Sequence, residues 1–424
     1  MTYQLTTLPS GIRVLTLSKP EALAARVAIY ASVGSRHEWE AVNGASHFIE
    51  HMLFKGTARR TARKISQTIE GQGGMLNAYT DRDHTCYYAK VPCDKVFLAL
   101  DVLADLFYHA AFDPKELDRE RQVIAEEIRM YDDQPDSVVL DRLVSQLWSG
   151  HPLGRPILGT LEGIAAMPRE ALLSYWRGQY APARTLFAFT GRVEHARCVA
   201  AVERLTRTVQ AAPMLREPEP FSPVIPLEPL SLERRAGIQQ AQLAFGWRTP
   251  AWREAEASAA LPALSCLLAE TMMGRLFQSI REKRGLCYSI SGGISQLTDC
   301  GILAITAGCA PEKALRCARA VLAECRRVAE KPIGAAELRR TRDYLSGRFR
   351  LRLDEAPLWY VAARTLFGMP IEPEAHLARL EALTPEAIRA CASALFTPGN
   401  LALTVLLPEG THAPAAAWGR LIGA

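Results

Sequence analysis

The chain has 424 residues, of which 49% are hydrophobic and 22% are charged, and this balance is ordinary for a folded globular protein. Its length exceeds what a single hydrophobic core usually serves, so two or three domains are expected. The formal net charge of +5 is small for this size, and no basic block with interleaved aromatic residues marks a nucleic-acid surface. No run of about 18 apolar residues is present, which argues against a membrane span.

The first ten residues contain no basic segment followed by an apolar one, so no signal peptide is expected. The ten cysteines form no C-x-x-C pair, and several fall within predicted helices. We therefore interpret these cysteines as small buried hydrophobic residues of a protein in a reducing compartment. The pattern does not indicate a disulfide framework or a Cys-rich zinc site. These features together predict a cytoplasmic protein.

Hydrophobic periodicity and turn residues predict the elements of the first half in chain order. Residues 11–33 alternate as two strands. The elements expected after them are helices over 43–55 and 61–70, strands over 76–80 and 85–91, helices over 94–108 and 114–131, and a strand over 185–190.

Six prolines lie between residues 211 and 230, and this density predicts an extended linker without regular structure. The linker separates a first domain, residues 1–210, from a second domain, residues 231–424.

The two halves resemble one another in the order of their elements. The segment 93–107 has a counterpart in 311–325, and each follows a predicted strand and precedes another helix. The next helices align at an offset of 221 residues, which pairs Glu127 with Arg348 and Glu120 with Thr341. We therefore expect an α+β protein made of two copies of one domain.

One stretch in the first half carries a metal-binding pattern, since His47, Glu50 and His51 form H-x-x-E-H. Positions i and i+4 of a helix lie on one face, so both imidazoles can reach one ion and Glu50 lies on the same side. Neutral imidazole is the commonest metal ligand, and a catalytic zinc takes three protein ligands and keeps one position for water. The pattern is the inverted zincin motif.

The same segment has a simpler interpretation. Phe48, Ile49, Met52 and Leu53 alone would make it an amphipathic core helix whose polar positions face solvent. A metal site therefore needs a third ligand from elsewhere in the first half, because the second half contains no His-rich helix.

The predicted helix over 114–131 offers three carboxylates. Glu120 and Glu127 are seven residues apart and share a helix face, whereas Glu126 points elsewhere. Any one of them could instead be an ordinary solvated carboxylate.

The motif at 47–51, followed 76 residues later by Glu127 in Val-Ile-Ala-Glu-Glu-Ile, resembles the M16 metallopeptidases, the pitrilysin or inverzincin family. The length and two-domain layout are similar to the branch with the mitochondrial processing peptidase subunits and their bacterial relatives. The resemblance implies the LuxS/MPP-like metallohydrolase fold: two similar α/β-roll domains, each a mainly antiparallel sheet covered by helices.

The resemblance also implies roles for the residues of the motif. His47, His51 and Glu127 would bind one Zn²⁺ per chain, and Glu50 would be the general base. Glu120 matches a family carboxylate that could orient a ligand without binding the metal itself.

Two further segments resemble family elements. Asn77, Ala78 and Tyr79 match an edge strand whose backbone pairs with the substrate peptide, although an ordinary edge strand is the alternative. Arg281 and Tyr288 match a pair in the second domain that contacts the substrate carbonyl, although the residues alone indicate only a solvated helix end.

One segment departs from the family pattern. Many bacterial relatives have a Gly-rich turn before Arg281, whereas this chain has Ala269-Glu-Thr-Met-Met-Gly274, which we expect to continue as helix.

The resemblance implies a zinc endopeptidase that cleaves peptides or small unfolded polypeptides inside a dimeric chamber. The partners expected are the peptide substrate and a second copy of the chain. A second copy is expected because this chain carries both the zinc-site residues and the Arg281/Tyr288 pair. A heterodimer with a homologous subunit, for example one dedicated to a small precursor peptide, remains open. So does a non-catalytic scaffold of the same fold.

Overall fold

The computed structural model describes residues 3–209, 217–223, 227–412 and 414–423. The chain forms two compact units, each built around one β-sheet. The first unit contains Met1–Arg129, Arg155–Glu219 and Ala356–Ile371, and the second unit contains Met130–Gly154, Pro220–Glu355 and Glu372–Ala424.

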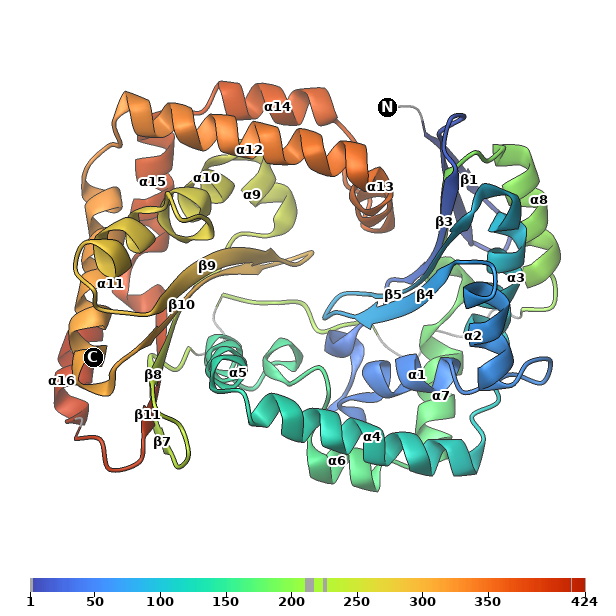
Figure 1. Ribbon diagram of the computed structural model, residues 1–424, viewed down its shortest axis with the longest axis horizontal. Helices are drawn as coiled ribbons and strands as arrows, with labels where there is room; N and C mark the ends of the chain where they lie inside the picture. Colours follow the sequence, from blue (N-terminus) through green and yellow to red (C-terminus); the bar gives the residue numbers. More distant parts are fainter. Residues whose placement is uncertain (1–2, 210–216, 224–226, 413, 424) are drawn as a thin grey trace. The chain divides into compact units, whose positions relative to one another are not determined.

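The sheet of the first unit has six strands in the order β1-β2-β6-β3-β5-β4 (Figure 1). Its pairings are antiparallel except for β2 with β6, which is parallel. The strands are β1 (Gln4–Thr7), β2 (Arg13–Ser18), β3 (Ala24–Ala31), β4 (Met75–Thr80), β5 (Thr85–Pro92) and β6 (Thr185–Gly191). β4 is therefore an edge strand.

Helices cover both faces of this sheet. α3 and α8 lie against one face, and α13 lies against the other (Figure 1). Every residue of β6 is consequently buried, as expected for a central strand covered on both sides. The helices of the first unit are α1 (Ala45–Leu53), α2 (Ala62–Glu70), α3 (Val96–His109), α4 (Pro114–Asp132, as far as Arg129), α6 (Leu161–Ala166), α7 (Arg169–Gln179), α8 (His195–Thr206) and α13 (Pro357–Leu366).

The sheet of the second unit has five strands in the order β7-β11-β8-β10-β9, and only β7 with β11 is parallel. The strands are β7 (Leu230–Arg235), β8 (Ala241–Thr249), β9 (Ser289–Gln296), β10 (Gly301–Cys309) and β11 (Leu401–Pro408). β9 is the edge strand in the place that β4 takes in the first unit.

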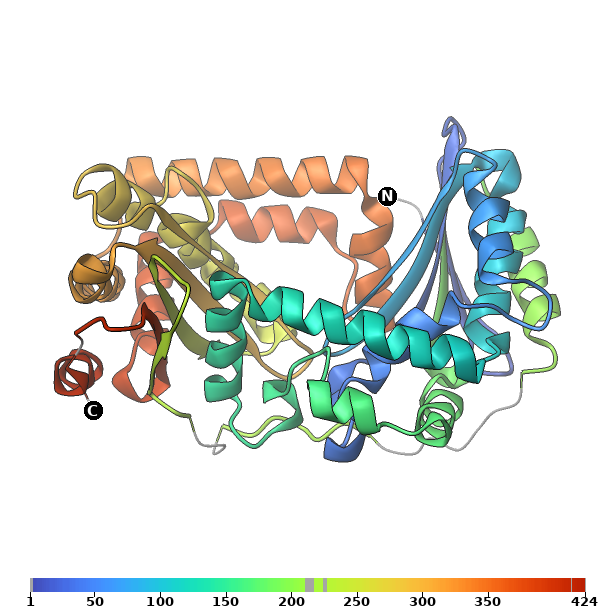
Figure 2. The same cartoon turned by 60° about the horizontal axis from the view of Figure 1, so that its bottom comes forward.

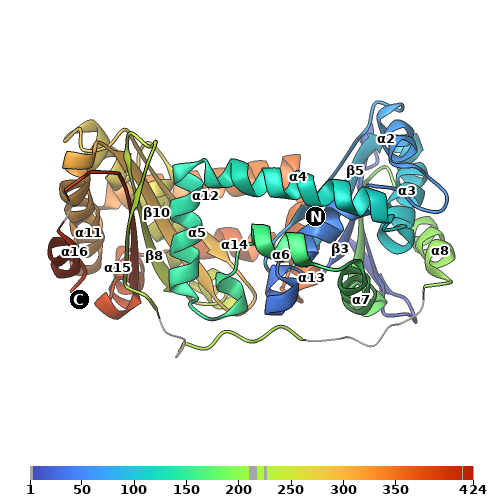
Figure 3. The ribbon, with the colours of Figure 1, turned by 90° about the horizontal axis from the view of Figure 1, so that it is seen from below.

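α10, α11 and α15 pack on one face of the second sheet, and α5 packs on the other face (Figure 3). α12 and α14 lie side by side in the same unit (Figure 2). The helices are α5 (Pro135–Leu147), α9 (Trp252–Ser258), α10 (Ala260–Ser265), α11 (Ala314–Glu330), α12 (Ala335–Glu355), α14 (Pro373–Glu381), α15 (Pro385–Leu395) and α16 (Ala415–Ile422), with π-helical segments at Cys266–Glu270 and Phe277–Glu282.

Each half of the chain supplies one helix to the other half's unit. α5 precedes the Pro-rich segment but packs on β8 through Val139, Leu143 and Leu147, which recur every four residues on one face. α13 comes from the second half but packs on the first sheet, where Trp359 contacts Tyr88 with ring centroids 4.9 Å apart. The compact units are therefore not contiguous in sequence, because each sheet needs a helix on its second face.

The predicted fold class is confirmed, since both units are similar α/β arrangements with mainly antiparallel sheets. The Pro-rich segment lies partly outside the described residues, namely at 211–216 and 224–226, and the parts between and beside them contain no helix or strand until β7. Within the described ranges, none of the helices combines the length and apolarity needed to cross a bilayer.

The expected helix across 269–274 is wrong in its second part. The helix ends at Glu270 and Thr271 is extended. The chain then turns back, so that Gly274 N donates to Thr271 O at 2.9 Å and a Cβ at Gly274 would lie 2.7 Å from Leu268 O. This close approach requires the glycine, and Met272 is left exposed in the turn.

Candidate metal centre

The amino-terminal end of α1 is held by a buried carboxylate. Glu38 accepts hydrogen bonds from the backbone N–H groups of Gly44 and Ser46, both at 2.7 Å, and from the Asn43 side chain at 3.0 Å. The Glu38 oxygens thus accept from backbone N–H groups that have no partner within the helix at its start. Gly44 has φ +93°, and a Cβ there would lie 2.7 Å from Leu158 O, so the chain enters the helix through a position that only glycine fits.

Glu38 gives a pH dependence to the stability of this region. Burial outweighs its hydrogen bonds and raises the pKa of Glu38 to about 7, above its ordinary value of 4.5. Between these values the folded protein holds the proton more tightly than the unfolded chain does, so this carboxyl group makes the protein less stable as the pH rises. Glutamine does not titrate, and the unfolding free energy of Glu38→Gln relative to the native protein should therefore increase from about pH 5 to 7 and level off above 7.

Urea unfolding of both proteins in the presence of a chelator, followed by tryptophan fluorescence, measures this difference. A difference that stays flat or falls across that range would contradict the protonated state of Glu38.

Three side chains on two helices converge on one point. His47 and His51 lie on α1, and Glu127 lies on α4. Glu127 Oε2 is 3.4 Å from His51 Nε2 and 3.7 Å from His47 Nε2. Among the described residues these three form the one His, Cys, Asp and Glu group with mutually close ligand atoms, all within 4.8 Å of one another.

The spacing of these atoms fits a tetrahedral ion. Bonds of roughly 2.1 Å at tetrahedral angles place neighbouring ligand atoms about 3.4 Å apart. Two imidazoles and one carboxylate are also a donor set found at catalytic zinc sites with an open fourth position. The residues present therefore fit zinc.

A second carboxylate on α4 contacts one of the two histidines. Glu120 is buried, and its Oε2 lies 3.0 Å from His51 Nδ1, which leaves His51 Nε2 facing Glu127. Its other oxygen, Oε1, pairs with Lys55 Nζ at 2.6 Å. A carboxylate that fixes the far nitrogen of a ligand histidine determines its tautomer and its direction.

The electrostatics of the group favour a divalent cation. Burial and the neighbouring His51 lower the pKa of His47 to about 4. Burial opposes protonation of His51 as well, but its hydrogen bonds to Glu120 and Glu127 outweigh burial and raise the pKa of His51 to about 9. The hydrogen bond to His51 lowers the pKa of Glu127. Two ionised carboxylates thus concentrate negative charge around two imidazole rings.

Glu50 lies beside the group without belonging to it. Its Oε2 accepts a hydrogen bond from Thr80 Oγ1 of β4 at 2.5 Å, and burial raises the pKa of Glu50. The carboxylate of Glu50 is therefore held between α1 and the edge strand β4.

The three predicted substrate-binding residues lie on that edge strand. Asn77 and Tyr79 are exposed, and the Asn77 Oδ1 accepts from the N–H of Ala78 at 2.8 Å. Since β4 has a partner on one side only, the backbone of Ala78 faces a free sheet edge in this unit. Their contact with a peptide stays a prediction.

Arg281 and Tyr288 lie together in the second unit. The Arg281 guanidinium carbon is 5.9 Å from the centre of the Tyr288 ring and 4.5 Å from that of Phe277. The Tyr288 side chain is 74% exposed, so the pair is available to a ligand. Their role also stays a prediction.

Three residues around the site were missed from the sequence. Glu38 and Thr80 carry no local signal, because their contacts with α1 come from the tertiary fold. Lys55 had one, because the helix expected over 43–55 places it four residues after His51 and on the same side.

The fold and this site define a two-unit α/β protein with a His₂Glu group whose spacing fits a metal ion. Residues 13–161 match the family model described as insulinase (peptidase family M16), and residues 166–345 match the model described as peptidase M16 inactive domain. The chain belongs to peptidase family M16.

Relatives that match most of this chain support this assignment. The chain is 38% identical to an uncharacterized zinc protease of Mycobacterium leprae over 84% of this chain and 80% of the relative. It is 32% identical to an uncharacterized zinc protease of Bacillus subtilis over 95% of this chain and 98% of the relative. It is 30% identical to a probable mitochondrial-processing peptidase subunit beta of Arabidopsis thaliana over 96% of this chain and 78% of the relative.

Solved structures share the fold. A protease from Helicobacter pylori superposes with a TM-score of 0.87 at 21% identity, over 96% of this chain and 99% of that one. A structure from Pseudomonas fluorescens, described as a peptidase M16 inactive domain, gives a TM-score of 0.88 at 18% identity over 98% of this chain and 100% of that one.

Proposed function

We propose that this chain is a zinc-dependent endopeptidase that cleaves peptides or small unfolded polypeptides. One observation carries the proposal: His47, His51 and Glu127 converge with ligand spacing while Glu50 stands beside them, hydrogen-bonded to the strand that ends the sheet. Relatives named zinc proteases support the choice of metal and reaction. When bound, zinc supplies a Lewis acid for the scissile carbonyl and makes a water more acidic.

The chain's own residues supply the remaining steps. The Glu50 carboxylate accepts the proton of the attacking water and later delivers it to the leaving amine nitrogen. Glu120 keeps His51 Nδ1 protonated and the ring in place. The free edge of β4 offers backbone donors and acceptors to an extended peptide, a mode of binding that is indifferent to most side chains.

The same proposal assigns Arg281 and Tyr288 to the developing oxyanion, as the family resemblance implies. It also assigns the chain to the cytoplasm. It assigns the chain to a homodimer, since one chain carries both the metal-binding group and the Arg281/Tyr288 pair. Light scattering of the purified chain tests the assembly, and an active monomer would contradict it.

A chelator experiment tests the function. The purified protein is incubated with a peptide library, and the products are analysed by mass spectrometry, before and after metal removal by 1,10-phenanthroline. Hydrolysis should disappear with the metal and return on addition of Zn²⁺, with one zinc bound per chain, because the three ligands form a single site. Cleavage that continues in fully metal-free protein would contradict the proposal.

A further inference from the structure

A cavity of about 430 Å³ lies within the second unit, between α12, α14 and the edge strand β9. Gly292 and Gly293 of β9 form one wall. A Cβ at Gly293 would meet no atom within 4 Å, whereas a Cβ at Gly292 would lie 2.6 Å from Ala304 O. Phe349 of α12 and Leu380 of α14 provide apolar surface. This volume is in the range of small-molecule and peptide side-chain pockets.

The cavity takes the place in the second unit that the metal centre takes in the first. α12 is the repeat counterpart of α4, β9 is an edge strand like β4, and a helical segment packs against the edge strand in each case. At the offset of 221 residues, Arg348 stands where Glu127 stands. The position of a metal-binding carboxylate thus carries a positive charge here.

The acid in this cavity is already neutralised. Glu270 Oε2 pairs with Arg348 Nη1 at 2.7 Å, and its Oε1 accepts from Ser265 Oγ at 2.6 Å. Both oxygens of Glu270 are therefore engaged, and the guanidinium beside them would repel a cation. The same pair fixes one end of Arg348 and leaves its other N–H groups for a ligand.

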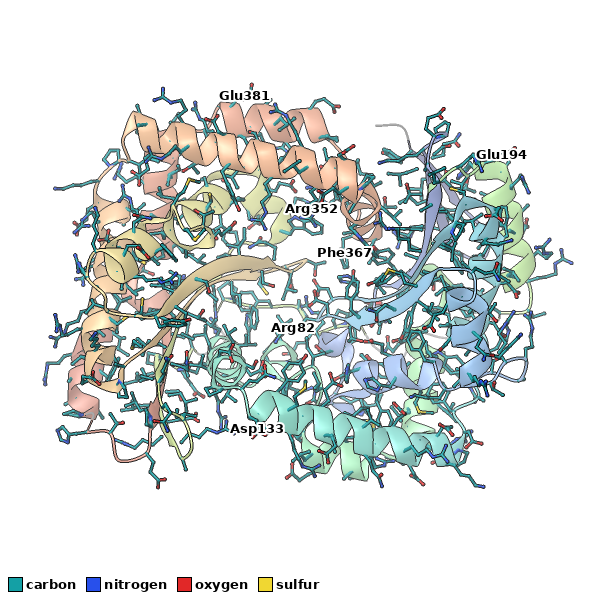
Figure 4. All side chains as sticks on the ribbon, viewed as in Figure 1. Arg82, Asp133, Glu194, Arg352, Phe367 and Glu381 are labelled. Carbon is teal, nitrogen blue, oxygen red and sulfur yellow. The ribbon has the colours of Figure 1, made fainter. Side chains whose placement is uncertain are left out.

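A second arginine, Arg352, adds a positive charge to the lining of the cavity. Arg352 follows Arg348 by four residues on α12, so the two guanidinium groups extend from one helix face into the cavity. Figure 4 shows Arg352 on the side of α12 nearest β9. Arg352 has no hydrogen bond or ion pair with any residue that the structure describes.

The remaining ionisable group does not change this balance. His376 lines the cavity, and its Nδ1 lies 3.2 Å from the carboxylate oxygen Oε1 of Glu256, which is not among the lining residues. Among the residues that line the cavity, Arg348 and Glu270 pair with each other, and Arg352 leaves a net positive charge.

We propose that this cavity binds a carboxylate of a peptide, held between Arg348 and Arg352, while Phe349 and Leu380 contact the adjoining aliphatic part. Guanidinium groups match the planar, two-oxygen geometry of a carboxylate. A side-chain carboxylate and a C-terminal carboxylate share this chemistry. That the anion belongs to a peptide rests on the proposed function, whereas the site itself rests on the cavity and its charges.

A binding measurement on the Glu50→Gln protein in the presence of a chelator tests this inference without any hydrolysis. The probe is an acetylated Gly/Ser peptide that carries a neutral dye and ends in glutamate with a free carboxylate, followed by fluorescence anisotropy. Three companion peptides replace the glutamate by glutamine, amidate the C-terminus, or do both. The doubly neutral peptide should bind at least about tenfold more weakly, and the two singly changed peptides show which carboxylate is used.

Two variants, each made on the Glu50→Gln background, locate the binding. Arg352→Gln should weaken binding of the acidic peptide about tenfold. Arg350→Gln is the matched control, because it removes the same charge from an exposed position on another face of the same helix and should change affinity less than about twofold.

Equal weakening by both variants, or equal binding of all four peptides, would overturn the carboxylate site. Either outcome leaves the zinc peptidase proposal intact, because hydrolysis by the metal-loaded native protein is measured separately.

Discussion

Replacing Glu50 by glutamine is expected to lower kcat for peptide hydrolysis by about 10³-fold or more, while zinc content and peptide affinity stay close to those of the native protein. The amide keeps the shape of the carboxylate and its contact with Thr80 but cannot accept a proton, and general base catalysis contributes roughly 10²–10⁴-fold. Glu50 is not among the three converging ligands, so the metal should remain bound.

Steady-state kinetics with a quenched fluorescent peptide and metal analysis of the same sample measure both quantities. Glu70→Gln, at an exposed position at the end of α2, controls for the loss of one carboxylate. Retained hydrolysis in Glu50→Gln would remove this residue from the mechanism. Simultaneous loss of zinc would instead show that it acts on the metal.

A graded loss of zinc is expected when three glutamates of α4 are changed to glutamine one at a time. Glu127→Gln removes an anionic ligand and should abolish stoichiometric zinc binding and activity. Glu120→Gln removes the carboxylate that holds His51 Nδ1 and should weaken zinc by about 10–100-fold. Glu126→Gln, which removes an exposed carboxylate paired with Arg129, should leave zinc binding unchanged.

Competition with a chromophoric chelator gives the three zinc affinities, and circular dichroism checks that each variant is folded. The order Glu127, Glu120, Glu126 is the result that matters. Equal zinc affinities in Glu127→Gln and Glu126→Gln would contradict the ligand set, and an unchanged affinity in Glu120→Gln would show that the Glu120–His51 contact does not support the metal.

Much of the local structure could be predicted from the sequence. The helix expected over 114–131 is α4 (Pro114–Asp132), and the strands expected over 76–80 and 85–91 are β4 and β5 within one residue at each end. Proline at a helix start and glycines after a helix end act through adjacent backbone, so such boundaries are visible without the fold. The exception at 269–274 arose because the turn at Gly274 depends on a close contact with Leu268 O, which no local pattern encodes.

The pairing of sheets with their covering helices could not be predicted in the same way. α5 and α13 have ordinary amphipathic patterns, and such a pattern states that a face is buried without stating against which sheet. Each of the two helices completes the unit of the other half, and only the packed structure identifies the partner.

The same distinction between local pattern and tertiary packing applies to the candidate site. The sequence by itself determined that His47, Glu50 and His51 share a helix face, because the periodicity of an α-helix places positions i, i+3 and i+4 together. Only the tertiary structure decided that Glu127 closes on both imidazoles, that Thr80 holds Glu50, and that the matching place in the second unit became a positively charged cavity. Those contacts join segments far apart in the chain, and their distances follow from how sheets and helices pack, which no spacing of residues specifies.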